Sequence, residues 1–100
     1  MKYYIGVDLG TSAVKLLLMD QDGNVVNIVS REYPLYFPYP GWSEQKPEDW
    51  WEQTKEGIRH LVEPVDSSLV AGISFGGQMH GLVILDEQDR VIRPAILWND

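Results

Sequence analysis

The sequence contains no cysteine among its 100 residues, and only 8 lysines and arginines against 15 aspartates and glutamates. Without thiols the chain cannot form a disulfide scaffold, an iron–sulfur site or a thiolate zinc site, and its composition suits a reducing cytoplasm. The formal net charge of −7 argues against a nucleic-acid-binding protein or a partner of anionic membranes, because both need clustered Lys and Arg. We therefore predict a cytoplasmic protein that binds neither nucleic acid nor a membrane.

Long apolar runs are also lacking. The longest clear one, Leu16–Met19, is far shorter than the roughly 20 residues that a membrane helix needs. Asp8 interrupts the N-terminal apolar run before the core of a signal peptide can form. A hydrophobic content of 44% is nevertheless ordinary for a globular chain, and the length suits one domain with a modest core.

Three short β-type runs open the chain, with tight turns between them. They cover residues 3–8, 14–19 and 25–33. The first gap holds Leu-Gly-Thr-Ser and the second an Asp-Gly turn signal. Because parallel pairing needs a crossover of a dozen or more residues, these gaps predict an antiparallel meander.

The middle of the chain changes from strands to a proline-rich loop and then to a helix. Three prolines within residues 34–42 exclude a helix and an interior strand there. Pro47 suits the first position of a helix, and Pro64 stops it, so we predict a helix over residues 47–63. Apolar and small residues at helical spacing predict its buried stripe: Trp50, Thr54, Ile58 and Leu61.

The last third of the chain predicts more strands. Residues 70–75 form a predicted strand that can pair in parallel because a helix precedes it. A glycine-rich turn over 76–81 and a strand over 82–85 follow, and Val91-Ile92 begins the return. The order of elements predicts an α/β domain with a mixed sheet.

One internal similarity appears when the chain is shifted by 66 residues. Five identities over about twenty positions are few enough to arise by chance, and we interpret them as one strand–turn pattern used twice rather than as a duplicated unit. The identical pairs are Gly6 and Gly72, Gly10 and Gly76, Leu16 and Leu82, Asp20 and Asp86, and Val25 and Val91.

The first motif with chemical potential is Asp-Leu-Gly-Thr-Ser at residues 8–12. A polyphosphate needs a glycine for close backbone approach, hydroxyl donors and a carboxylate that can hold Mg²⁺, and this segment has all three. No Gly-Lys-Ser/Thr P-loop and no Gly-x-Gly-x-x-Gly occurs. The alternative is an ordinary polar hairpin turn, with Lys15 as a solvated strand residue.

The second motif is Gly-Gly-Gln-Met-His-Gly at residues 76–81. Gln78 and neutral His80 can both donate and accept hydrogen bonds, and Met79 packs adaptably, which suits a polyhydroxyl ligand. The alternative is a glycine-rich connection in which His80 bonds to the backbone. Trp42, among polar neighbours, either stacks on a sugar face or packs as an anchor.

Taken together, these segments resemble the N-terminal part of the FGGY carbohydrate kinases, which belong to the actin, Hsp70 and sugar-kinase fold group. The likeness is carried by residues 4–15, 41–45, 47–51, 76–81 and 93–100. Gln-Met-His-Gly after a glycine pair is similar to members that act on D-xylulose. The resemblance implies a ribonuclease-H-like N-terminal lobe, an α/β fold whose mixed sheet starts with an antiparallel three-strand meander.

The resemblance also implies roles for residues, with ATP and Mg²⁺ as cofactors. Asp8 would lie beside the transferring phosphoryl group and the metal. The residues implied to face the ATP phosphates are Gly10, Thr11, Ser12 and Lys15. The residues implied to contact the ketose, D-xylulose, are Gln78, Met79, His80, Asn99 and Asp100.

The resemblance places residues 1–100 in the first part of the N-terminal domain. The general base, the adenosine pocket and the C-terminal domain would lie beyond Asp100, so we expect this segment alone to be inactive. The intact enzyme, expected as a homodimer, would convert D-xylulose and ATP to D-xylulose 5-phosphate and ADP. The alternatives are a kinase for ribulose, gluconate or glycerol, or a non-enzymatic actin-like binding module.

Overall fold

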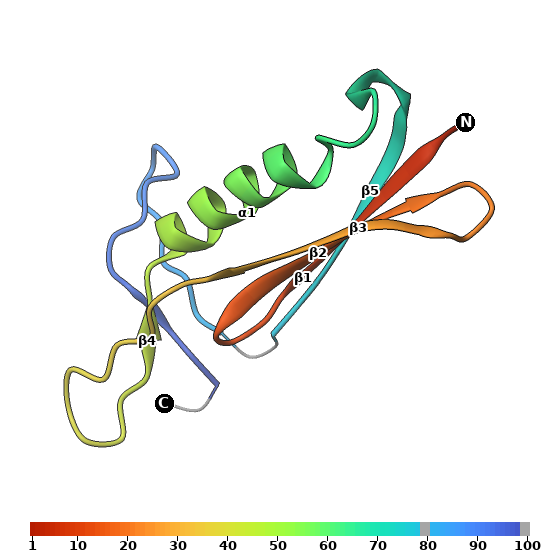
Figure 1. Cartoon of the computed structure of the whole chain (residues 1–100). Coiled ribbons are helices and arrows are strands. Elements are labelled where there is room, and N and C mark those ends of the chain that lie inside the picture. The colour runs from red at the N-terminus through yellow and green to blue at the C-terminus, as the bar shows by residue number, and fades with distance from the viewer. Residues whose placement is uncertain (79–80, 99–100) are drawn as a thin grey trace.

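The computed structural model describes residues 1–78 and 81–98, and Figure 1 shows one helix lying across one side of a twisted sheet. The main sheet has four strands in the order β3-β2-β1-β5. These strands are β1 (Tyr3–Leu9), β2 (Ala13–Asp20), β3 (Val25–Glu32) and β5 (Val70–Gly77). The remaining elements are β4 (Glu44–Gln45), α1 (Pro47–Leu61), the 3₁₀ turn η1 (Ser67–Leu69) and β6 (Ala95–Ile96). No helix within the described ranges is long and apolar enough to cross a membrane.

The pairing of the strands confirms both topological predictions. β1 with β2, and β2 with β3, pair antiparallel, which gives the expected meander. β5 pairs in parallel with β1 after the chain has crossed over through α1. The short strands β4 and β6 form a separate antiparallel ribbon at one end of the main sheet.

The core lies between the sheet and α1. Alternate residues of β2, namely Val14, Leu16 and Leu18, are buried together with Ile5 and Val7 of β1. Leu61 of the helix is fully buried against this cluster. The period-two pattern of the strands and the helical stripe thus meet in one apolar layer, as the sequence predicts.

The helix ends two residues earlier than predicted. Val62 is its C-cap, and the backbone N–H of Val62 donates to the carbonyl of Ile58 at 3.2 Å. Pro64 disfavours helical geometry in the residue before it, so the last turn unwinds ahead of the proline rather than at it.

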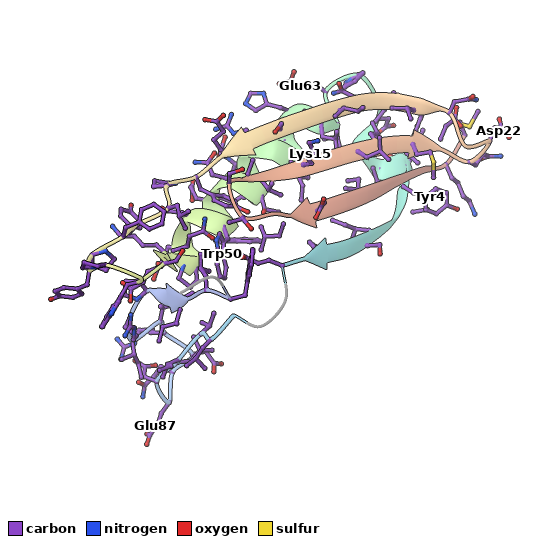
Figure 2. All side chains as sticks on the ribbon, turned by 90° about the horizontal axis from the view of Figure 1, so that it is seen from below. Tyr4, Lys15, Asp22, Trp50, Glu63 and Glu87 are labelled. Carbon is purple, nitrogen blue, oxygen red and sulfur yellow. The ribbon has the colours of Figure 1, made fainter. Side chains whose placement is uncertain are left out.

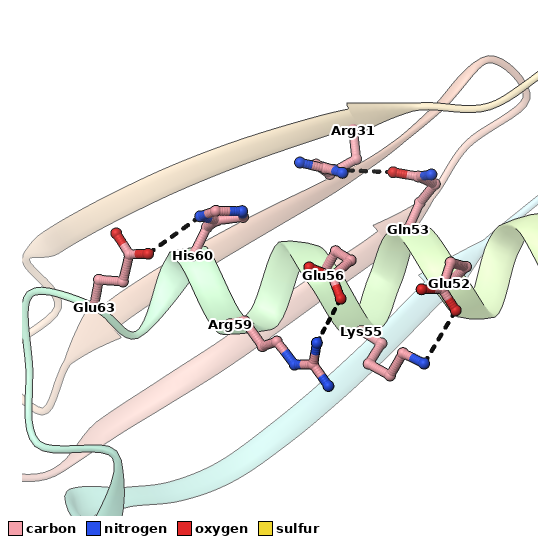
Figure 3. A network of polar contacts seen from close by, with 8 residues as sticks. All are labelled: Arg31, Glu52, Gln53, Lys55, Glu56, Arg59, His60 and Glu63. Atoms are coloured by element: carbon pink, nitrogen blue, oxygen red, sulfur yellow. Dashed lines mark hydrogen bonds and ion pairs between the residues drawn. The ribbon is translucent and has the colours of Figure 1, made fainter.

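The outer face of α1 is solvated and carries short-range ion pairs (Figure 3). Lys55 pairs with Glu52 at 3.0 Å, and Arg59 pairs with Glu56 at 2.6 Å. These exposed i,i+3 pairs each stabilise the helix by only a few tenths of a kcal/mol. The helix turns this face to solvent because its opposite face, with Thr54, Gly57 and Leu61, is buried.

The 66-residue similarity extends to the geometry of two turns. Asp20 Oδ1 accepts from the backbone N–H groups of Asp22 and Asn24, and Asp86 Oδ1 accepts from those of Gln88 and Arg90. The shift also matches two of the three described residues with positive φ, Gly23 at 86° and Asp89 at 62°. The turns of the repeated strand–turn pattern are therefore confirmed, but its strands are not, because residues 82–85 form only isolated bridges.

The predicted strand over residues 82–85 is wrong. This run makes only single bridges, from Leu82 to Ile96 and from Leu85 to Val91. Its two partners lie on separate short segments, so no continuous ladder forms, and Leu82 and Leu85 stay about half exposed. Gly76 and Gly77, predicted as part of a turn, instead extend β5.

Candidate functional site

The two motifs predicted independently from the sequence lie side by side. Because β1 and β5 are parallel, their carboxyl ends reach the same edge of the sheet, where Leu9 is the register partner of Gly77. The backbone N–H of Gln78 donates to the carbonyl of Leu9 at 3.0 Å. The Gly-Thr-Ser turn after β1 and Gln78, directly after β5, therefore border one site.

The turn after β1 is tight. The Gly10 N–H donates to the Ala13 carbonyl at 2.9 Å, and a Cβ built on Gly10 would stand 3.0 Å from that same backbone oxygen. A side chain at position 10 would push the turn open, so glycine is required by close approach. Thr11 and Ser12 form the tip, and Ser12 is exposed.

Tyr33 supports this turn from below. Its backbone N–H donates to the Ser12 carbonyl at 3.2 Å, and its hydroxyl lies against the carbonyls of Gly10 and Ala13. Tyr33 is buried in the core cluster. The phenol thus ties the turn to the interior of the domain, a role that no local sequence signal marks.

Gln45 holds the same turn from the side. Its amide Nε2 donates to the Thr11 carbonyl. Its Oε1 accepts from the indole Nε1 of Trp50 at 2.9 Å and from Nε2 of Gln78 at 3.1 Å. Gln45 is completely buried, and its one amide joins the turn, the helix and the end of β5.

Asp8 and Lys15 lie opposite one another on the face of the sheet away from α1. They are register partners on β1 and β2 and both are exposed. Figure 2 looks onto this face, with Lys15 labelled in front of the helix. Together with Gly6, Ser74 and other strand residues they line an open hollow of about 520 Å³.

A magnesium ion would find one carboxylate here. No group of three or more His, Cys, Asp and Glu residues within the described ranges is arranged to hold a metal. Mg²⁺ nevertheless commonly binds through one or two carboxylates, several waters and substrate phosphates. Asp8, exposed near the end of β1, suits that mode of binding.

The pKa of Tyr33 is raised by its surroundings in the site. Burial first, and the negative charge of Asp8 second, raise the pKa of Tyr33 to about 12. The phenol therefore stays protonated and remains a donor to the turn throughout the physiological pH range. The charge of Asp8 thus acts on the tyrosine that anchors the turn.

Replacing Tyr33 by Phe is expected to destabilise the protein by about 1–2 kcal/mol at neutral pH, because the carbonyls of Gly10 and Ala13 lose a donor. The pKa of Tyr33 is raised from 10.0 to about 12 in the folded state. In the wild type, the stability that the protonated hydroxyl contributes is therefore complete below pH 10 and is lost as the pH rises to 12. The loss is on the order of 2 kcal/mol. Urea unfolding measured across pH 9 to 12 tests both effects.

Tyr39→Phe is the matched control, because Tyr39 is exposed and its ring packs only edge-on against Trp42 at 4.8 Å. It should retain both the neutral stability and the alkaline loss of the wild type. An alkaline loss in Tyr33→Phe equal to that of the wild type would contradict the assignment of this titration to Tyr33.

The structure brings most of the predicted residues together. Asp8, the residues of the turn and Gln78 lie at one end of the sheet, and Lys15 faces Asp8 across the strands. Met79, His80, Asn99 and Asp100 lie outside the described residues. Of the chain before them, Ala95 is the register partner of Gln45, and the Leu97 N–H donates to the Ser43 carbonyl at 3.0 Å.

Known proteins resemble the whole chain. Residues 3–100 match the N-terminal domain of the FGGY family of carbohydrate kinases. The xylulose kinase of Bacillus subtilis (strain 168) is 54% identical over 102 residues, covering 100% of this chain and 20% of that protein. The ligand-bound xylulose kinase structure from Lactobacillus acidophilus has a TM-score of 0.95 at 37% identity, covering 100% of this chain and 20% of its own.

A gluconate kinase structure from the same organism has a TM-score of 0.94, also at 37% identity, over 99% of this chain and 20% of its own. The chain therefore spans about a fifth of the length of the relatives it matches. The fold is that of the N-terminal lobe of sugar kinases, as the sequence predicts, and it is shared by relatives named for different sugars.

Proposed function

The chain belongs to the FGGY family of carbohydrate kinases, and from this premise we propose that it forms the first part of the N-terminal domain of a D-xylulose kinase. The observation that carries the choice of sugar is the 54% identity, across the whole chain, with the xylulose kinase of Bacillus subtilis. The fold alone would not favour xylulose over gluconate, because structures named for both sugars match it equally well.

The proposed reaction transfers the γ-phosphoryl group of ATP to the terminal hydroxyl of D-xylulose. The hydroxyl oxygen bonds to the γ-phosphorus, the bond between that phosphorus and the bridging oxygen breaks, and ADP leaves. The hydroxyl proton passes to a general base that we place beyond residue 100. Such a transfer depends on positioning and on neutralising the phosphate charge rather than on covalent chemistry.

In this proposal the turn binds the ATP phosphates. Gly10 allows close approach, while Thr11 and Ser12 supply N–H and hydroxyl donors. The support comes from the buried partners of the turn, Tyr33 and Gln45, which fix its carbonyls and therefore the direction of its amides. Donors held in place before the phosphates arrive lose no energy in reorganising.

Asp8 and Lys15 carry the charges of the proposed site. Asp8 would hold Mg²⁺, which when bound neutralises charge on the transferring phosphoryl group. Lys15 would add a positive charge on the same face of the sheet, opposite Asp8. Gln78, Met79, His80, Asn99 and Asp100 are proposed to contact the sugar.

Turnover by the full-length enzyme that carries this chain tests the proposal. We expect the highest kcat/KM with D-xylulose in a panel that also contains D-ribulose, gluconate and glycerol, with ATP and Mg²⁺ present. A higher kcat/KM with gluconate would favour the second candidate, a gluconate kinase, which the equal structural match supports. Absence of turnover with every sugar would reject the kinase and favour a binding module.

Two properties of the intact enzyme belong to the same proposal. We place it in the cytoplasm and expect a homodimer. Cell fractionation and analytical ultracentrifugation of the full-length protein measure these properties directly. Recovery in the membrane fraction, or a monomer at all accessible concentrations, would contradict them.

A further inference from the structure

We propose that Gln45 is the positioning residue that sets the phosphate-binding turn and the sugar-binding segment in one fixed relation. The inference rests on the proposed function, because it assigns those two roles to the segments that Gln45 joins. Gln45 itself is buried beneath the turn and is not proposed to touch either substrate.

The side chain of Gln45 uses both ends of its amide. The NH₂ group donates toward the turn, at the Thr11 carbonyl. The oxygen accepts from Trp50 on α1 and from Gln78 after β5, at 2.9 and 3.1 Å. An amide is the only uncharged side-chain group that combines donors with a two-lone-pair carbonyl acceptor at this reach.

Because Gln45 is buried, each of these hydrogen bonds is costly to lose. Gln45 is 0% exposed, so water cannot replace a lost partner, and an unpaired polar group there costs about 1–3 kcal/mol. Thr11, Trp50 and Gln78 must therefore keep their positions relative to one another for all three bonds to persist. Trp50 supplies the rigid end of this arrangement, because its indole belongs to the helix that packs on the core.

The contact with Gln78 also decides how Gln78 is oriented. Its Nε2 is committed to Gln45, which leaves Oε1 as the atom still available. That oxygen is buried and has no hydrogen-bond partner among residues 1–78 and 81–98. Gln45 therefore turns Gln78 so that its remaining polar atom is an acceptor, which a sugar hydroxyl reaches only when the atoms covering it move aside.

This arrangement matters for phosphoryl transfer because the reacting atoms must be aligned. A displacement of about 1 Å can cost on the order of 100-fold in rate. The backbone bond from the Gln78 N–H to the Leu9 carbonyl, at 3.0 Å, also ties Gln78 to the last residue before the turn. Gln45 is the link that also fixes the side chain.

Two substitutions test the amide: one removes only its donor, and the other removes all of its bonds. Gln45→Glu, with its carboxylate ionised, keeps an acceptor for Trp50 and Gln78 but has no proton to donate to the Thr11 carbonyl, so it disturbs the turn. Gln45→Met keeps the approximate size and loses all three bonds. The matched control is Gln53→Met, because Gln53 is half-buried on α1 and its Oε1 accepts from Arg31 Nε at 2.9 Å (Figure 3).

The experiment measures kcat and both KM values in the full-length enzyme, normalised to folded protein by thermal unfolding. For Gln45→Met we expect kcat to fall by about 10- to 100-fold with KM for both substrates raised. For Gln45→Glu we expect KM for ATP to rise about fivefold or more, while KM for D-xylulose stays within about twofold. Gln53→Met should match the wild type.

A purely structural role for Gln45 would lower the melting temperature and leave kcat per folded molecule unchanged. Wild-type values of kcat and both KM in folded Gln45→Met would overturn the inference. Should both Gln45 variants fail to fold, Trp50→Phe removes one donor and keeps the aromatic packing, and a kcat within twofold of the wild type would then overturn it. A wild-type enzyme without D-xylulose turnover rejects the proposed function instead.

Discussion

Asp8→Asn is expected to lower kcat with D-xylulose by about 100-fold or more in the full-length enzyme. The amide is nearly isosteric, but it removes the one negative charge that the described site offers to a divalent cation. Asp8 is exposed, so the substitution should leave the fold intact. Steady-state kinetics at several Mg²⁺ concentrations measure the effect, and we expect more Mg²⁺ to be needed for half-maximal rate.

A second observable links the same substitution to the structure. The charge of Asp8 contributes to the raised pKa of Tyr33, so Asp8→Asn should lower the pKa of that phenol toward its ordinary value. Ultraviolet titration of tyrosine absorbance detects this shift without any substrate. Asp22→Asn, in the exposed turn between β2 and β3, is the control and should alter neither observable. A kcat for Asp8→Asn within threefold of the wild type would remove Asp8 from the proposed chemistry.

Leu16→Ala is expected to reduce the free energy of unfolding by about 3 kcal/mol. Leu16 is 1% exposed and lies at the centre of the layer between β2 and α1, so its removal leaves a cavity. Hydrogen exchange of the β2 amides reports the stability of this region within the full-length protein. Ile28→Ala is the control, because Ile28 is 63% exposed on the opposite face of the sheet.

Gly57 provides an internal check on this cavity. A Cβ at Gly57 would stand 2.6 Å from Leu16 Cδ1, so the helix approaches β2 closely only because this residue lacks a side chain. Gly57→Ala alone should therefore destabilise the protein despite the better helix propensity of alanine. In the Leu16→Ala background the clash is gone, and Gly57→Ala should become stabilising. Additive effects of the two substitutions would contradict direct packing of Gly57 on Leu16.

The part of the fold that the sequence predicts well is the part decided by neighbours in the chain. The meander follows from turn signals a few residues long, and α1 follows from Pro47 and a helical stripe. The run at 82–85 has the same apolar character as a true strand. It fails because strand formation also needs a continuous partner, which no local pattern reports.

The candidate site divides in the same way. Asp8, Gly10 and Gln78 are predicted by residue type and motif, since their chemistry can be recognised without knowing what surrounds them. Tyr33 and Gln45 are not, because each acts through partners far away in the sequence. The sequence neighbours of Tyr33 and Gln45 do not indicate which backbone carbonyls these side chains bond to.

The topology of the sheet sets an order in time. The whole meander lies within residues 3–32, so a ribosome has released every strand of it well before β5. The antiparallel strands close short loops and can pair at little entropic cost, whereas β5 must find β1 across the whole intervening chain. One edge of β1 therefore stays unpaired until β5 has been synthesised. Because Gln78 directly follows β5, we expect the growing chain to complete the turn after β1 first and the connection of this turn to Gln78 last.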